Sequence, residues 1–278
     1  MQVANPETSP NVAALPHRAG GISFVSLLRG EPGAKDNFEL TLVHTTDEFQ
    51  TPRHRHNFDQ VRVMLEGEFG YDTDRVQPQD TIGYFSEGTY YKQQGIGQSL
   101  TLLLQLGGAT GSGYMSFQQL KDTTAALGEK GEFNDGIYTY YDEAGKKHNA
   151  DGYEAAWEAL FGKKLTYPKP RYQQPVVLTP DHFTWLPMDG SDGRVQQREL
   201  GRFHERGLEI AQFRLASGGQ LALPASKGIQ LVFVYDGDGT IGDQAVSRRF
   251  AVQLDPGEAA SAEADSEMTL LRLRLPVF

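Results

Sequence analysis

Short runs of β-branched, aromatic and alternating residues, separated by turn residues at fairly even spacing, dominate this chain. In the first half they include "NFELTLVHTT", "FDQVRVMLEGEFGYDT" and "SLTLLLQLGG", and in the second half "GLEIAQFRLASGGQLALP" and "IQLVFVYDGDGTIGD". Alternation with a period of two is typical of half-buried strands, and runs joined by tight turns predict hairpins. The pattern predicts an all-β protein built as a sandwich or a barrel.

The second half of the chain resembles the first half. "FDQVRVMLEGEFG" can be laid over "GIQLVFVYDGDGT" with Gln60 on Gln230, and the later "QPQD" then faces "LDPGE". An internal repeat of this kind indicates two copies of one structural unit. We therefore expect an N-terminal barrel over residues 22–114 and a C-terminal barrel over residues 185–278.

Two segments lie outside this repeat. Residues 1–21 are rich in Pro, Asn, Ala and Ser, and we expect them to form an extended arm. Residues 115–184 predict a part-helical insert followed by a proline-rich strap, "YPKPRYQQPVVLTP", that joins the two halves. The sequence leaves open whether the insert covers the mouth of the first barrel or an exposed sheet edge.

Two stretches of the insert have helix signals. Ser116 with Gln119, and Asp151 with Glu154, have the spacing of capping boxes, and Gly162 marks a helix end. In the second helix the apolar residues recur at helical spacing. This recurrence indicates a packing face rather than a cofactor site, made by Tyr153, Ala156, Trp157, Leu160 and Phe161.

The composition excludes several classes of partner. The 278 residues have a formal net charge of −10 and a pI near 5.2, and their Lys and Arg residues are scattered, which argues against nucleic acid. Without cysteine, any metal must be bound by nitrogen and oxygen atoms. No run approaches the roughly twenty apolar residues that cross a membrane, and no signal-peptide pattern is present. We expect a cytoplasmic protein.

The stretch "TPRHRHNFDQVRVMLEGEFGY" offers the clearest candidate site. Strand alternation places His54 and His56 on one face, where two imidazoles could share one metal ion or stand as polar residues at the lip of a strand. In the same register Gln60, Arg62 and Met64 point into the barrel, and polar residues buried there need partners. The residues between them then pack on the outer face: Val61, Val63 and Leu65.

"PRHRHNFDQVRVMLEGEFGY" followed by "PQDTIGYFSEGTYYKQQG" resembles the two signature motifs of the cupins, G…H-x-H…E…G and G-D…P-x-G…H. The resemblance covers roughly Asn37 to Gly108, and the whole chain if the second half is a degenerate repeat, as in a two-domain bicupin. It implies barrels of the jelly-roll type, called double-stranded β-helices. It also implies one Fe, Mn, Zn, Ni or Cu ion, bound by the motif histidines and an acidic residue.

This chain departs from the cupin motifs at two ligand positions. Gln60 stands at the acidic position, and Tyr91 stands where the second motif has its histidine. The resemblance thus implies His54, His56, Gln60 and Tyr91 as ligands of a divalent transition metal, with Fe, Mn, Zn and Ni all open. A pocket without metal stays open as well, because Gln lacks the carboxylate charge and Tyr must lose its proton to ligate.

Further residues are candidates for substrate binding or catalysis. Arg62 could hold a substrate carboxylate with two hydrogen bonds, or form a structural ion pair. Tyr91 could serve as a metal ligand or as a general acid, and Met64 and Gln93 could line the pocket. His44 could replace the missing third histidine, or it could simply end a strand.

These candidates support hypotheses from three classes. The first is a metal-dependent enzyme of dioxygenase, isomerase or lyase type, acting on a small acidic or phenolic organic substrate. The second is a non-catalytic cupin that binds a small molecule without metal. The third is a structural module that pairs with a second copy of the chain, since twofold homodimers are the commonest oligomers.

Overall fold

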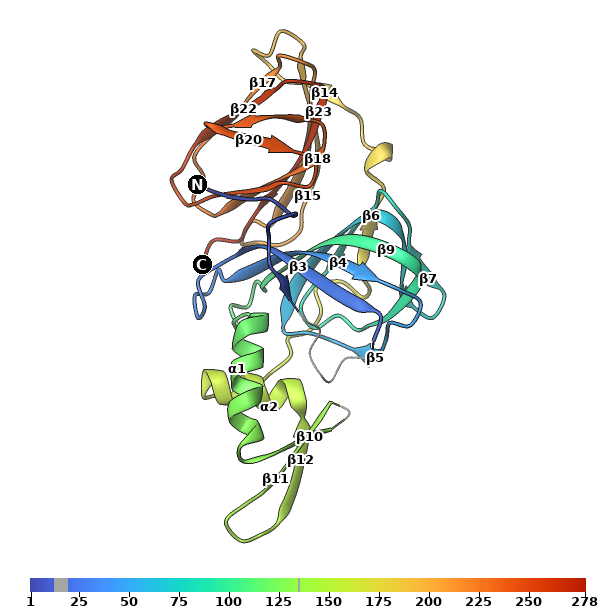
Figure 1. Ribbon diagram of the computed structural model, residues 1–278, viewed down its shortest axis with the longest axis vertical. Coiled ribbons are helices and arrows are strands. Elements are labelled where there is room, and N and C mark those ends of the chain that lie inside the picture. Colours follow the sequence, from blue (N-terminus) through green and yellow to red (C-terminus); the bar gives the residue numbers. More distant parts are fainter. Residues whose placement is uncertain (13–19, 135) are drawn as a thin grey trace.

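The computed structural model describes residues 1–12, 20–134 and 136–278 of the chain. It shows two β-barrels stacked on each other, with the insert projecting from the first barrel on the side away from the second (Figure 1). His17 and the middle of the expected N-terminal arm lie outside the described residues. Within the described residues no helix is long and apolar enough to cross a membrane.

The first barrel is built on a nine-stranded sheet of order β13-β8-β6-β9-β4-β3-β2, with β5 paired to β9 and β7 paired to β6. All of its strand pairs are antiparallel, as hairpin-rich sequences favour. The strands are β2 (Asn11–Val12), β3 (Ile22–Arg29), β4 (Phe38–Thr45), β5 (Gln50–His54), β6 (Phe58–Asp72), β7 (Arg75–Gln77), β8 (Ile82–Phe85), β9 (Tyr91–Gly107) and β13 (Val176–Leu178).

The second barrel consists of two antiparallel sheets, β1-β21-β18-β23-β16-β15-β14 and β17-β22-β19-β20. A 3-10 turn, η1 (Pro180–His182), precedes it. The strands are β1 (Gln2–Ala4), β14 (Leu186–Pro187), β15 (Val195–Arg202), β16 (Glu209–Leu215), β17 (Gln220–Leu223), β18 (Gln230–Asp236), β19 (Asp238–Ile241), β20 (Gln244–Ser247), β21 (Ala251–Leu254), β22 (Ala260–Ala264) and β23 (Met268–Arg274).

Segments from outside each barrel complete its sheet. Strand β1, at the start of the chain, pairs with β21 of the second barrel, whereas β2 pairs with β3 of the first barrel. Strand β13, at the end of the strap, pairs with β8 of the first barrel. The arm therefore contacts both barrels, and the end of the linker covers an edge of the first sheet.

The insert folds as two helices and a three-stranded sheet. Helix α1 (Phe117–Gly128) begins with the expected capping box, and α2 (Gly152–Phe161) begins at Asp151, whose side chain accepts the Glu154 N–H. Helix α2 ends at Gly162 in a left-handed conformation, as predicted. The sheet contains β10 (Gly131–Asn134), β11 (Ile137–Tyr141) and β12 (Lys147–Asp151), and the α2 stripe packs against α1 around buried Trp157.

Alternation along β6 separates the barrel interior from the interface between the barrels. The interior face presents Gln60 and Arg62, which line a cavity. The other face packs against the second barrel, beside Leu231 and Phe233 of β18. The predicted outward residues belong to this interface core: Val61, Val63 and Leu65.

Backbone hydrogen bonds fix how the two halves correspond. Asp80 donates its N–H to the Met64 carbonyl, and Arg249 donates its N–H to the Val234 carbonyl in the same way. This pairing agrees with Gln60 laid over Gln230. It equates "QPQD" with the turn that contains Arg249, however, so the predicted match to "LDPGE" is wrong.

The correct partner of "LDPGE" is "FSEGT". Gly257 donates its N–H to Ser226, as Gly88 donates its N–H to His56, at 2.9 and 2.8 Å. The sequence alignment failed here because "QPQD" and "LDPGE" both combine Pro with an acidic residue, as turns often do. Only the backbone hydrogen bonds show that they are not equivalent.

Apolar side chains fill the interior of the second barrel. At the positions of the two motif histidines it has Pro224 and Ser226. Gln230 stays buried and donates to the Pro224 carbonyl at 2.9 Å, where its counterpart in the first barrel contacts a histidine. The interior cluster comprises Val195, Ala211, Phe213, Leu215, Leu221, Leu223, Val232, Val234, Ile241, Val246, Val252, Leu254, Ala262, Ala264, Met268 and Leu270.

Candidate functional site

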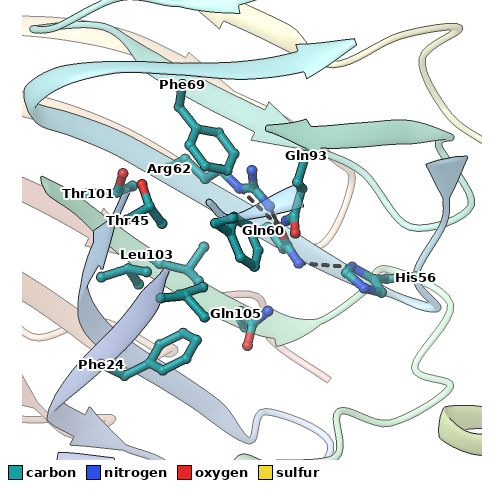
Figure 2. A pocket seen from close by; sticks show the side chains of 13 residues that line it. Phe24, Thr45, His56, Gln60, Arg62, Phe69, Gln93, Thr101, Leu103 and Gln105 are labelled. Atoms are coloured by element: carbon teal, nitrogen blue, oxygen red, sulfur yellow. Dashed lines mark hydrogen bonds between the residues drawn. The ribbon is translucent and has the colours of Figure 1, made fainter. Parts of the chain in front are cut away.

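Two cavities of the first barrel share part of their walls. The inner cavity lies within the barrel (Figure 2) and has a volume of about 30 Å³. The second, here called the vestibule, lies between the barrel mouth and the insert and has a volume of about 500 Å³. His56, Gln93 and Gln105 line both cavities. The inner cavity holds no more than a water molecule or two, whereas the vestibule is large enough for a small organic molecule.

Six aromatic side chains from different parts of the chain line the vestibule, together with the two motif histidines and other residues. Phe58 begins strand β6, Tyr90 directly precedes β9, and Tyr114 lies between β9 and α1. The insert and the strap supply the rest. The insert thus covers the barrel mouth, which settles the choice that the sequence left open. The aromatic lining residues are Phe58, Tyr90, Tyr114, Phe117, Tyr153 and Tyr167.

The two motif histidines stand together at the floor of the vestibule. His54 ends β5, where it pairs with Tyr91 of β9 beyond a bulge. The ring centroids of His54 and His56 lie 4.9 Å apart, and that of His54 lies 4.6 Å from the ring of Tyr91. The ring of His56 stacks on Phe58 at 4.4 Å. The expected convergence of the histidine pair with Tyr91 is therefore present.

Gln60 links His56 to Arg62 through its side-chain amide. Its oxygen accepts hydrogen bonds from Arg62 Nε and Nη2 at 3.2 and 2.8 Å. Its nitrogen lies 2.8 Å from His56 Nδ1 (Figure 2). The Tyr91 hydroxyl lies 2.7 Å from the same Nδ1 and 3.2 Å from the Gln60 oxygen. Four of the predicted site residues thus form one hydrogen-bonded network.

Arg62 is enclosed by aromatic rings. Its guanidinium carbon lies 4.5, 5.2 and 5.4 Å from the ring centroids of Phe85, Tyr91 and Phe69. The side chain is 4 % exposed. Ring faces attract a cation, and that attraction strengthens when water is excluded. Arg62 lines the small inner cavity and not the vestibule, as far as the described residues define the two, so its grip on a substrate carboxylate stays a prediction.

His54 has a defined hydrogen-bonding direction. Its Nδ1 lies 2.8 Å from the Pro52 carbonyl oxygen, which can only accept, so Nδ1 carries the proton. An imidazole oriented in this way by a backbone carbonyl is common among catalytic and metal-binding histidines.

A divalent ion shared by His54, His56, Gln60 and Tyr91 does not fit this arrangement. The Gln60 oxygen already lies against the positive guanidinium of Arg62, which would repel a second cation. Nδ1 of His56 is occupied by Gln60 and Tyr91. Metal ligation by these residues stays a prediction.

A buried asparagine of the motif attaches the insert to the barrel. Asn57 donates to the Gly113 carbonyl at 3.2 Å and to the Ser112 hydroxyl at 3.3 Å. Its side-chain oxygen accepts the Tyr153 hydroxyl of α2 at 2.9 Å. The segment that leads into the insert and helix α2 are therefore both fixed to Asn57, the neighbour of His56, which positions the vestibule wall.

Glu39 of β4 supports the same wall from the barrel side. Its carboxylate accepts the backbone N–H of Phe117, at the start of α1, and the hydroxyl of Tyr114, at 2.9 and 3.0 Å. Burial raises the pKa of Glu39, while the hydrogen bonds from Phe117 and Tyr114 oppose the shift. The side chain thus orients Tyr114 and the first turn of the helix.

Arg55 closes the rim between barrel and strap. Its guanidinium lies 4.9 Å from the ring of Tyr90 and 4.3 Å from the ring of Tyr167. Burial raises the pKa of Tyr167 to about 12, so its hydroxyl keeps its proton at neutral pH. These contacts hold the strap residue Tyr167 over the vestibule.

Of the remaining substrate-binding candidates, Gln93 and Met64 lie on the inner face of the barrel wall and His44 lies on its outer face. Gln93 lines both cavities as predicted, and buried Met64 packs inside the barrel against Phe49 and Phe69. His44 contradicts its predicted role. It is exposed on the outer face, because it shares that face of β4 with Leu42, whose side chain packs between the barrels.

Sequence reasoning missed the residues that the insert and the motif loop add. Tyr114, Tyr153 and Tyr167 line the vestibule, although the sequence predicts Tyr153 only as a packing residue. Asn57 and Arg55 flank His56 in the motif itself. The one available signal was the polar and charged character of the residues between and after the motif histidines.

No family model matches the chain, and no curated protein matches it. Solved structures do. A "putative dioxygenase" from Nostoc punctiforme superposes with a TM-score of 0.64 at 9 % identity, covering 99 % of this chain and 81 % of that one. Bacterial pirin YhhW from Escherichia coli, in complex with nickel(II), superposes with a TM-score of 0.56 at 12 % identity, and the match covers 99 % of both chains. The Bacillus subtilis oxalate decarboxylase OxdC, solved as a point mutant, superposes with a TM-score of 0.56 at 10 % identity. The match covers 99 % of this chain and 77 % of that one.

The protein has the bicupin fold. At these identities the likeness establishes the architecture of the chain and not its chemistry. The predicted homodimer and cytoplasmic location of the protein stay predictions.

Proposed function

We propose that the first barrel of this bicupin binds a small aromatic molecule bearing hydroxyl or carbonyl oxygen, with its polar group at His54 and His56. The observation that carries the proposal is the vestibule of about 500 Å³, walled by six aromatic side chains above the histidine pair. Aromatic walls bind flat apolar rings, and a few convergent polar groups then fix the orientation of the ligand.

Among the predicted acidic and phenolic ligands, the site favours the phenolic class. The buried cation, Arg62, faces a cavity of about 30 Å³, which is too small for a carboxylate together with the rest of a ligand. The ligand instead meets His54 and His56, which line the vestibule, and a neutral imidazole is a base in the physiological pH range. Proton transfer to such a base would support isomerase or lyase chemistry, and binding alone requires only the hydrogen bond.

Removal of one vestibule ring tests the proposal. Tyr153→Ala should weaken binding of 1-naphthol, measured by isothermal titration calorimetry, by about tenfold or more, because ring contact and buried apolar area are lost. Tyr141→Ala removes a 63 % exposed tyrosine from the same insert and should leave the affinity unchanged. Failure of the wild-type protein to bind aromatic phenols, or equal losses in both variants, would contradict the proposal.

A metal-dependent enzyme is the second candidate. The orientation of His54 by the Pro52 carbonyl favours it, and proteins of similar fold include one solved with nickel(II) and a Streptomyces albus enzyme solved with Fe(II). Bound metal would require the hydrogen bonds between Gln60 and Arg62 to open. His54 and His56 would then supply imidazole ligands, and the ion would supply Lewis-acid or redox chemistry.

Elemental analysis of protein purified without chelator separates the two candidates. We expect substoichiometric metal and no change in melting temperature on addition of Ni²⁺, Zn²⁺ or Mn²⁺. Stoichiometric metal that disappears in both His54→Ala and His56→Ala would instead establish the second candidate. His148→Ala, at a histidine of the insert hairpin that pairs with Asp142, is the matched control.

A further inference from the structure

The donors and acceptors of the hydrogen bonds between Arg62, Gln60 and His56 can be assigned in only one way. A guanidinium can donate hydrogen bonds but cannot accept them, so the Gln60 atom that faces Arg62 must be the amide oxygen. The Gln60 atom that faces His56 is therefore the amide nitrogen, which can only donate. Nδ1 of His56 must then be an acceptor and is unprotonated.

The contacts of Tyr91 agree with the assignment of His56 Nδ1 as an acceptor. Its hydroxyl lies within hydrogen-bond distance of His56 Nδ1 and of the Gln60 oxygen, and both of these atoms are acceptors. Tyr91 must therefore donate. Two donors converge on Nδ1, so the proton of the neutral His56 ring stands on Nε2, at the edge of the ring away from Gln60.

We propose that Arg62 replaces a metal ion as the fixed cation of this barrel and, through Gln60, makes His56 a hydrogen-bond donor at Nε2. The ligand class narrows accordingly, because a group that meets the Nε2–H of His56 must accept. This inference rests on the proposed function and specifies the ligand as an aromatic molecule with a carbonyl or phenolate oxygen.

Strand geometry explains how the network is held. Gln60 and Arg62 are two residues apart on β6, so both side chains point into the barrel, while Tyr91 enters from β9. Buried Arg62 cannot turn away, because three aromatic rings surround its guanidinium. The polarity of His56 is thus set by residues that lie behind it and have no direct contact with the vestibule.

Nitrogen-15 NMR of histidine-labelled protein tests the assignment directly. In the wild type we expect the proton of His56 on Nε2. In Gln60→Glu a carboxylate replaces the amide nitrogen that donates to Nδ1, so we expect Nδ1 to become protonated. A wild-type ring with its proton on Nδ1, or a ring unaffected by Gln60→Glu, would overturn the proposal.

Gln105→Glu is the matched control. Gln105 lines the same two cavities, but its side-chain oxygen accepts from Tyr114 at 3.0 Å rather than belonging to the Gln60 network. The same change of charge at this position should leave the proton of His56 on Nε2. A shift of equal size in Gln105→Glu would show that the tautomer responds to charge in general, and this too would overturn the proposal.

Three probes of similar size test the ligand class. Wild-type protein should bind chromone at least about tenfold more tightly than naphthalene, because the carbonyl of chromone can accept a hydrogen bond from His56 and naphthalene cannot accept one. In Gln60→Glu this preference should disappear. Equal affinities in the wild type would overturn the ligand class. If chromone, naphthalene and 1-naphthol all fail to bind, the proposed function fails, while the NMR result still decides the tautomer of His56.

Discussion

Gly88→Ala is expected to lower the free energy of unfolding by about 3 kcal/mol or more, through two separate costs. Gly88 has a φ of 78°, a left-handed conformation that a side chain disfavours. A Cβ at this position would also stand 2.2 Å from the backbone oxygen of Pro168 in the strap. Because that oxygen belongs to the backbone, either the strap or the loop must move.

Gly97→Ala provides the control for the backbone conformation alone. Gly97 has a similar φ of 58°, but no atom lies within 4 Å of its added Cβ. Urea denaturation of both variants should show a loss of about 1–2 kcal/mol for Gly97→Ala and a clearly larger loss for Gly88→Ala. Equal losses would show that the strap does not press on the loop.

The same substitution should affect the candidate site. Gly88 donates its N–H to the His56 carbonyl at 2.8 Å, and the strap that it contacts places Tyr167 over the vestibule. Movement of either segment would disturb the vestibule from two sides. We therefore expect Gly88→Ala to weaken binding of 1-naphthol as well as stability, whereas Gly97→Ala should leave binding unchanged.

A second large effect is expected at the interface between the barrels, where two titratable groups face each other. Oδ2 of Asp59 lies 3.4 Å from Nε2 of His204, and both side chains are fully buried. The Asp59 carboxylate also accepts the Tyr84 hydroxyl at 2.8 Å and the Glu87 N–H at 2.7 Å. Asp59 directly precedes Gln60, so this pair connects the second barrel to the site strand.

Burial shifts the two pKa values in opposite directions. It raises the pKa of Asp59 from 3.8 to about 7, with the Glu87 charge adding to the rise and its N–H opposing it. It lowers the pKa of His204 from 6.5 to about 4, helped by the nearby Arg171. Between about pH 4 and 6.5 the folded pair therefore holds one proton, on Asp59, and the unfolded pair also holds one, on His204.

Substituting either residue alone should reveal the opposite pH dependences that Asp59 and His204 give to the free energy of unfolding. In Asp59→Asn only His204 remains, and the unfolded state binds the extra proton, so relative to the wild type stability should fall as pH drops from 6.5 toward 4. In His204→Gln only Asp59 remains, and the folded state binds the extra proton, so relative stability should fall as pH rises from 3.8 toward 7. Each slope can reach ~1.4 kcal/mol per pH unit.

Urea denaturation at several pH values measures these slopes. The wild type should show little dependence from this pair, and the double variant Asp59→Asn/His204→Gln should resemble it. Slopes of the same sign in both single variants would contradict the assigned pKa shifts. His182→Gln, at an exposed histidine in η1, is the control for loss of a histidine outside the interface.

Local patterns predicted much of this fold because they depend on neighbouring residues. Alternation along β6 placed Gln60 and Arg62 inside and Val63 outside, and the capping residues of both helices were correctly found. Period and capping are properties of the backbone within one element. They therefore survive whatever the element packs against.

Errors arose wherever a residue's role depends on which element covers its face. His44 was considered as a replacement for the missing histidine, but the face of β4 that it shares with Leu42 lies outside the barrel cavity. Tyr153 belongs to a true packing stripe and also lines the vestibule, since its hydroxyl reaches Asn57, 96 residues away. A one-dimensional pattern gives the face of a residue but not its neighbour.

The sequence by itself determined the β architecture, the internal repeat and the pairing of His54 with His56, because side-chain alternation and turn chemistry act over a few residues. Only the tertiary structure decided what that pair can do. Arg62 reaches the amide oxygen of Gln60, Tyr91 arrives from a distant strand, and the insert brings its rings over the barrel mouth. Hydrogen-bond direction and enclosure depend on atoms that meet only when the chain is folded, and these atoms set the chemistry of the site.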